Sequence, residues 1–166
     1  MKQETLQLTT GGDPEKRRKL DFYPTPKNVT IALMDFLKLP TMKIWEPACG
    51  NGAMSKVLEY YEHEVYSSDI GDSDYGHTNV DFLSTSAPKK FDAIITNPPF
   101  SLSVEFIKKA LSEAPVVAML LKSQYWHAKD RYQLFVNNPP YLVLPLTWRP
   151  DFLEHERKPG EKKGAP

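Results

Sequence analysis

The sequence lacks several features that mark specialised classes of protein. It contains one cysteine, Cys49, which excludes an internal disulfide framework and a cysteine-rich metal site. No stretch approaches the roughly 20 consecutive apolar residues that cross a bilayer. The first twenty residues contain no apolar run of the kind found in secretory signals, and the four histidines show no metal-ligand spacing. We therefore expect a cytoplasmic protein that holds no metal and does not enter a membrane.

The chain also lacks an excess of either charge, since 21 basic and 21 acidic residues give a formal net charge of zero. This argues against a protein that coats nucleic acid by charge alone. Basic residues nevertheless gather at both ends, at 16–19 and, near the C-terminus, at Arg149, Arg157, Lys158, Lys162 and Lys163. Such runs are often solvated faces; alternatively, the two ends meet over one face and hold a phosphate backbone.

Composition and periodicity predict one α/β domain at 21–150, preceded by a flexible basic arm at 1–20 and followed by a flexible, basic, polar tail at 151–166. Apolar spacing and proline positions predict helices over 27–38, from about 53, over 104–113 and over 130–136. Strands are expected at 42–45, 63–70, 92–96, 115–126 and 141–148, with a short further element at 79–83. Strands that alternate with helices at this spacing indicate a mostly parallel, doubly wound sheet covered on both faces.

Residues 46–52 (EPACGNG) lie between the first predicted strand and its helix. Gly50 and Gly52 allow a sharp turn and a close approach of the backbone to a ligand. Ligands of open α/β sheets bind outside the carboxyl ends of the strands. By itself this loop also suits an ordinary strand-to-helix turn, and it is not a phosphate loop, because the GxxxxGK[ST] pattern is absent.

Two further acidic residues lie at positions suited to ligand binding near the ends of predicted strands. Asp69 ends the second predicted strand, where a carboxylate accepts hydrogen bonds from ribose hydroxyls in other nucleoside-binding sheets. Asp81 and Phe82 come one crossover later, and an acid beside an aromatic ring suits the binding of an adenine amine and the covering of the ring. Each position also fits an ordinary strand end or loop.

The segment Asn97-Pro98-Pro99-Phe100 directly follows an apolar strand. Two prolines remove two backbone donors and stiffen the loop, so the acceptors left are the Asn97 side-chain oxygen and the Pro98 carbonyl. Together they suit both hydrogens of an NH₂ group, while Phe100 offers a flat face to an extruded base. Farther along, Tyr125 and Trp126 follow a strand on the same side of the sheet, where they either line a base pocket or pack against it.

These motifs, in this order, resemble the amino-methyltransferase family of Rossmann-like, S-adenosylmethionine-dependent enzymes, and more narrowly the adenine-specific (N6) DNA methyltransferases of bacteria and phages. The resemblance covers about 22–148. It implies a cofactor site formed by Tyr23, Thr25 and Pro26 of FYPTP, Glu46, Pro47, Ala48, Cys49, Gly50 and Gly52 of EPACGNG, Asp69 with Ile70, Asp81 with Phe82, and Asn97.

The family's mechanism implies a catalytic loop of Asn97, Pro98, Pro99 and Phe100 and a base pocket that includes Tyr23, Phe100, Tyr125 and Trp126. The target adenine is flipped between the 23–26 strip and the catalytic loop, and the methyl group is transferred directly and in line. Cys49 is expected to pack as a small residue rather than act as a nucleophile.

The sequence departs from the family in two ways. No strand-like run follows Leu153, so the family's final antiparallel strand is missing, which suggests a missing C-terminal region or a partner subunit. No separate target-recognition domain is present, so we expect low sequence specificity. Three alternatives stay open: the same reaction on RNA, methylation of a protein glutamine, and an inactive methyltransferase-like partner subunit.

Overall fold

The computed structural model describes residues 24–127 and 129–152. Four short parallel strands are flanked by helices along the chain, although the segment between the second and third strands contains no helix. In order, the elements are α2 (Lys27–Leu37), β1 (Lys43–Glu46), α3 (Ser55–Tyr60), β2 (Glu64–Ser67), β3 (Ala93–Thr96), η1 (Phe100–Leu102), α4 (Ser103–Glu113), β4 (Val116–Met119), η2 (Ser123–His127), η3 (Lys129–Arg131) and α5 (Tyr132–Asn137). No helix in the described ranges is both long and apolar enough to cross a membrane.

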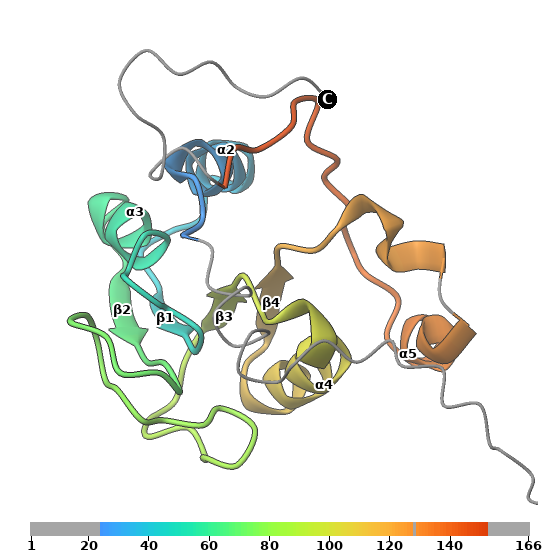
Figure 1. Ribbon diagram of the computed structural model, residues 1–166. Helices are drawn as coiled ribbons and strands as arrows, with labels where there is room; N and C mark the ends of the chain where they lie inside the picture. The colour runs from blue at the N-terminus through green and yellow to red at the C-terminus, as the bar shows by residue number, and fades with distance from the viewer. Residues whose placement is uncertain (1–23, 128, 153–166) are drawn as a thin grey trace, which may run out of the picture.

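The four strands form one sheet in the order β2-β1-β3-β4. β1 pairs with β2 on one side and β3 on the other, and β3 pairs with β4, always in parallel. Helices α2 and α3 lie over one face and α4 over the other (Figure 1). The predicted doubly wound α/β arrangement is therefore confirmed, with all carboxyl ends at one edge of the sheet.

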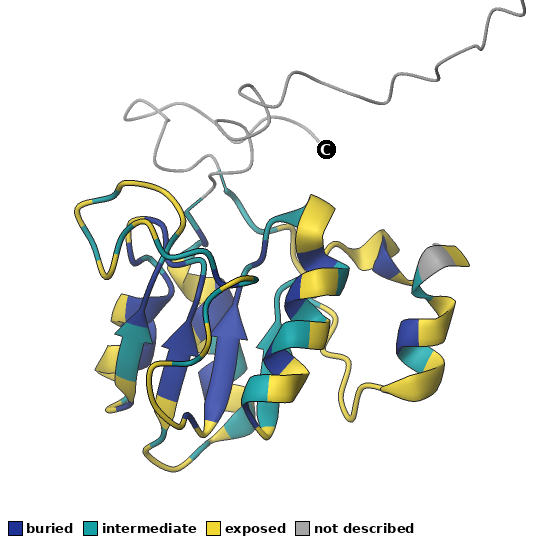
Figure 2. Cartoon of the chain, turned by 90° about the horizontal axis from the view of Figure 1, so that it is seen from below, coloured by how far each residue is buried: buried dark blue, intermediate teal, exposed yellow. Residues whose placement is uncertain are grey.

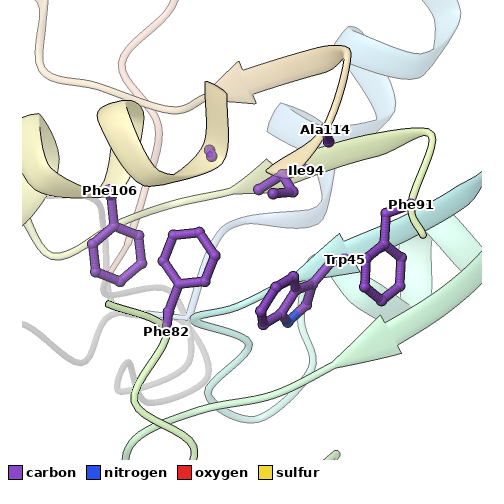
Figure 3. Packing of buried hydrophobic residues seen from close by; sticks show 7 residues of the cluster. Trp45, Phe82, Phe91, Ile94, Phe106 and Ala114 are labelled. Atoms are coloured by element: carbon purple, nitrogen blue, oxygen red, sulfur yellow. The ribbon is translucent and has the colours of Figure 1, made fainter. Parts of the chain in front are cut away.

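Alternation along the strands divides the core into two layers. Ile44 and Ile95 face the layer that contains Met34 of α2 and Leu58 of α3. On the opposite face, Trp45 belongs to a second cluster, to which β3, α4 and the loop between β2 and β3 contribute. The other buried members of this cluster are Phe82, Phe91, Ile94, Phe106, Ala110 and Ala114 (Figure 3). The ring centroids of Trp45 and Phe82 are 5.0 Å apart in an edge-to-face arrangement. These two layers hold the strand ends, and hence the site, in place.

The two longest helices agree closely with their predicted bounds. α2 starts after Pro26, whose φ of −56° suits a helix start, and ends at Lys38 in a left-handed conformation, two residues before Pro40. α4 buries Phe106 and Ala110 and exposes its other side, as its apolar spacing predicts.

Other predictions were wrong or too long. Residues 141–148 were predicted as a strand but form irregular, largely exposed chain, with Tyr141 96% exposed. Pro145 removes a ladder donor in the middle of this run, which explains why its apolar composition does not make a strand. The strand predicted at 115–126 ends at Met119 and gives way to η2. Residues 79–83 form no strand, because Asp81 starts a turn.

Candidate functional site

The candidate site lies where three parallel strands end at the same edge of the sheet. The glycine loop follows β1, Asp69 follows β2, and Asn97 follows β3 directly. This convergence is a consequence of the parallel topology, which places successive βα loops together.

The backbone of the glycine loop adopts the conformation that glycine favours. Gly50 has a φ of +51° and Gly52 a φ of +76°, both in the left-handed region. A Cβ built on Gly52 would lie 2.4 Å from the Tyr75 ring. Tyr75 therefore packs directly on the glycine loop, a contact that sequence analysis did not anticipate.

The loop that follows β2 holds the glycine loop by several hydrogen bonds. The Gly50 N–H donates to Asp69 Oδ2 at 2.8 Å, and the Gly71 N–H donates to Oδ1 at 2.7 Å. Ser73 Oγ donates to the Gly50 carbonyl, also at 2.8 Å. Each carboxylate oxygen of Asp69 has a second acceptor site, so this half-buried group retains capacity for ligand hydroxyls. Beside it, Ile70 is 67% exposed.

Glu46 lies beneath the loop rather than at its surface. Its side chain is 2% exposed and accepts a short hydrogen bond from Ser55 Oγ. Burial raises the pKa of Glu46 to about 8, even though the Ser55 hydrogen bond opposes that change. The group is therefore mainly a neutral acid at neutral pH, and it contributes a hydrogen bond rather than a charge.

Cys49 is 5% exposed, and burial raises the pKa of its thiol to about 12. The thiolate is thus scarcely populated at neutral pH, which disfavours a role as a nucleophile. Its packing role agrees with the expectation from sequence.

Asp81 and Phe82 occupy different environments. Asp81 is half-buried, and its Oδ1 accepts the Leu83 N–H at 3.0 Å. Phe82 is only 1% exposed and packs between Trp45 and Phe106. We expected Phe82 to cover an adenine ring, but in this conformation its ring is buried in the aromatic core and has no face exposed to a ligand.

Asn97 has the most informative environment in the site. Its Nδ2 donates to Thr25 Oγ1 at 3.1 Å, which joins the segment before α2 to the loop after β3. With the amide nitrogen held in this way, Oδ1 is buried and accepts no hydrogen bond from the described part of the chain. An unsatisfied buried acceptor costs about 1–3 kcal/mol, and such atoms in native structures call for an explanation.

The next three residues of this loop, 98–100, are buried or half-buried beside Asn97. Pro98 is buried, and Pro99, at φ −53° and ψ 124°, directs the chain into η1. Phe100 is half-buried, and Lys122 Nζ lies 4.2 Å from its ring centroid. No sequence motif indicated a role for Lys122, and its position after a predicted apolar strand was the only available signal.

Tyr125 and Trp126 differ in exposure. Tyr125 is 6% exposed, with the Arg131 guanidinium over its ring, whereas Trp126 is 44% exposed. Tyr23 lies outside the described residues, as do the basic runs at 16–19 and 157–163, so the structure places none of them.

The comparisons with known proteins concern the fold. No family model and no curated protein matches the chain. A proposed RNA methyltransferase from Pyrococcus horikoshii superposes with a TM-score of 0.53 and 17% identity, over 69% of this chain and 66% of that one. Magnesium protoporphyrin IX methyltransferase ChlM from Synechocystis, solved with bound S-adenosylmethionine, reaches 0.49 at 17% identity over 77% and 74% of the two chains. The 23S rRNA methyltransferase ErmE reaches 0.49 at 16% identity over 62% and 49%.

The likeness to the Pyrococcus protein agrees with the topology of the sheet. The chain has the α/β fold of the class I, Rossmann-like methyltransferases, and it spans about two thirds of the length of the Pyrococcus protein.

Proposed function

We propose that this protein transfers a methyl group from S-adenosylmethionine to the exocyclic N6 amine of adenine in DNA. The observation that carries the proposal is the buried, unpartnered Oδ1 of Asn97 in a class I methyltransferase fold. An acceptor held without a donor inside the protein is suited to a donor that arrives with the substrate, and the amine of adenine is such a donor.

The neighbouring residues suit the same ligand. Thr25 Oγ1 accepts from Asn97 Nδ2, which leaves the amide oxygen as the end of the group without a partner among the described residues. The next acceptor along the chain is the carbonyl of Pro98, and neither Pro98 nor Pro99 has an N–H that would compete. Asn97 Oδ1 and the Pro98 carbonyl would accept one amine hydrogen each, holding the nitrogen with its lone pair directed away from both acceptors.

Phe100 would support the base itself. An aromatic ring that follows the amine-binding residues offers a stacking surface to an extruded adenine. Lys122 lies against this ring in the structure, and its cation is well placed to pair with a phosphate of the nucleotide that carries the base. Binding would therefore exchange one contact of Lys122 for another.

The described residues fit S-adenosylmethionine as the methyl donor. Gly50 presents no Cβ to a ligand, whereas the corresponding side of Gly52 is covered by the Tyr75 ring. Asp69 retains acceptor capacity for ribose hydroxyls, and exposed Ile70 offers an apolar contact to the adenine of the cofactor. When bound, this cofactor supplies an electrophilic methyl group. The protein's own contribution is to position the acceptor amine.

The same amine-binding arrangement suits adenine in RNA, and the structural neighbour from Pyrococcus is a proposed RNA methyltransferase. RNA adenine-N6 methylation is therefore the second candidate. Methylation of a protein glutamine, and an inactive partner subunit, remain the further alternatives that the sequence left open.

The test is transfer of labelled methyl groups from S-adenosylmethionine to DNA and RNA in parallel. We expect label in DNA, and a loss of roughly 100-fold or more in Asn97→Ala, the scale seen when one preorganised hydrogen-bonding group is removed from an active site. Asn28→Ala, an exposed amide on α2, is the matched control and should leave the rate unchanged. Label in RNA alone would select the second candidate, and no label on either polymer would reject both.

A further inference from the structure

A groove on the outer side of the β4 edge is the strongest feature that the proposed reaction leaves unexplained. Its volume is about 780 Å³, within the roughly 300–1,000 Å³ usual for small-molecule pockets. Residues of η2 and α5 line it, with Lys129 between them. Figure 1 places both elements beyond α4, at the β4 end of the sheet, and in Figure 2 this part of the chain is largely exposed.

The groove presents aromatic rings to solvent. Trp126 is 44% exposed and Tyr132 is 64% exposed, and both contribute to the lining. Phe135, which also lines the groove, packs against Trp126, with 4.6 Å between the ring centroids and 31° between the planes. Phe135 in turn meets buried Tyr125 edge-on at 6.0 Å. An exposed indole packed against a neighbouring ring is a rigid stacking surface.

Cations accompany these rings. Residues 122–137 contain three Lys or Arg side chains and one acid, in a chain whose net charge is zero. Lys129 lines the groove with His127. Arg131 stacks on Tyr125, 4.0 Å from the ring centroid, and donates a hydrogen bond to the Tyr125 carbonyl. The local charge thus matches a polyanion with stackable rings.

One of the elements that line the groove follows a residue of the candidate site directly in the chain. η2 begins at Ser123, one residue after Lys122, whose ammonium lies over Phe100. The Leu120 N–H donates to the Thr96 carbonyl, so the chain leaving β4 is held beside the residue that precedes Asn97. A strand of nucleic acid whose base occupies the site would pass along η2 on its way out.

We propose that the η2–α5 groove binds single-stranded DNA next to the target adenine, with bases stacked on Trp126 and Tyr132 and phosphates paired with Lys129. Aromatic stacking suits single strands, because every unpaired base exposes a flat face whatever its sequence. The inference rests on the proposed function for the identity of the polymer. Beyond that function, the inference specifies which part of the surface binds the strand, and that single-stranded DNA is preferred.

The experiment measures binding of a short fluorescein-labelled single-stranded DNA to the full chain by anisotropy. Trp126→Ala and Tyr132→Ala should each weaken binding roughly 5- to 100-fold, whereas Trp126→Phe should keep most of the affinity. Lys129→Ala should reduce the slope of log affinity against log salt concentration by about 1, which corresponds to the loss of one phosphate contact. Tyr60→Ala is the matched control, since Tyr60 is an 83% exposed aromatic on α3 and does not line the groove.

Unfolding curves of each variant separate lost binding from lost structure. Wild-type affinity in the folded Trp126→Ala and Tyr132→Ala variants would overturn the inference, and so would tighter binding of duplex DNA or of RNA. Methyl transfer to DNA that both variants perform with unchanged KM would leave the proposed function standing and reject the groove. DNA binding that depends on the groove residues, without methyl transfer to DNA, would support the groove and reject the proposed function.

Discussion

Replacing Glu46 with glutamine tests whether the acid beneath the glycine loop is neutral in the folded protein. The free carboxyl group has an ordinary pKa of 4.5, and burial raises the pKa of Glu46 to about 8. Between these values the unfolded chain is ionised while the folded chain keeps its proton. Folding then takes up a proton at Glu46, so the contribution of this group to stability is greatest below about pH 4.5, falls as pH rises through this window, and levels off above about pH 8.

The magnitude follows from the width of the window. Each pH unit inside it costs about 1.4 kcal/mol, so between about pH 5.5 and about pH 7.5 the folded state loses up to roughly 2.7 kcal/mol from Glu46 alone. Glutamine is nearly isosteric with the neutral acid, and its oxygen still accepts from Ser55. Glu46→Gln should therefore exceed the wild type in stability at both pH values, by about 1.4 kcal/mol near pH 5.5 and by roughly 4 kcal/mol near pH 7.5.

Urea unfolding of both proteins at the two pH values measures this difference. The pKa of His63 is lowered by burial, which makes stability rise with pH, but this contribution is present in both proteins and cancels in the comparison. Identical pH dependence of the wild type and Glu46→Gln would refute the reasoning, because it would mean that Glu46 is ionised when folded.

Three further predictions concern the same region. Gly52→Ala should destabilise the fold by about 2–4 kcal/mol, because the new Cβ meets the Tyr75 ring at a positive φ; urea unfolding checks this, and adding Tyr75→Ala should recover the steric part. Cys49 should react with a thiol reagent at pH 8 only as fast as the protein unfolds, since its pKa is about 12; fast labelling of the native protein would contradict this. Ser68→Ala should cost about 1–3 kcal/mol in unfolding free energy, because the buried Trp45 indole N–H loses the acceptor that it meets at 2.8 Å; a loss below about 0.5 kcal/mol would argue against it.

The parts of the fold that were predictable have strong local signals. Residues 93–96 form an apolar run between an acid and a proline-rich loop, and all four are buried in β3. Proline and apolar spacing set the bounds of α2. The run at 141–148 carries the same apolar signal but is irregular and exposed, because whether such a run becomes a strand depends on a partner strand and on its donors.

The candidate site was predictable where chain order alone brings groups together. Parallel strands explain why the glycine loop meets Asp69 and why Asn97 lies at the same edge. The contact between Thr25 and Asn97 joins segments 72 residues apart; the resemblance to a family assigned both residues to one site but did not indicate this hydrogen bond. Side-chain packing decided the rest: it placed Phe82 in the core and Lys122 against Phe100, and neither outcome is visible in local sequence.

The most direct test of the central claim is to identify the methylated nucleoside. DNA incubated with the protein and isotopically labelled S-adenosylmethionine is digested and analysed by mass spectrometry, in parallel for the wild type and Asn97→Ala. We expect labelled N6-methyladenine with the wild type and a loss of roughly 100-fold or more with the variant. Label on any other nucleoside, or an undiminished yield from a folded Asn97→Ala variant, would contradict it.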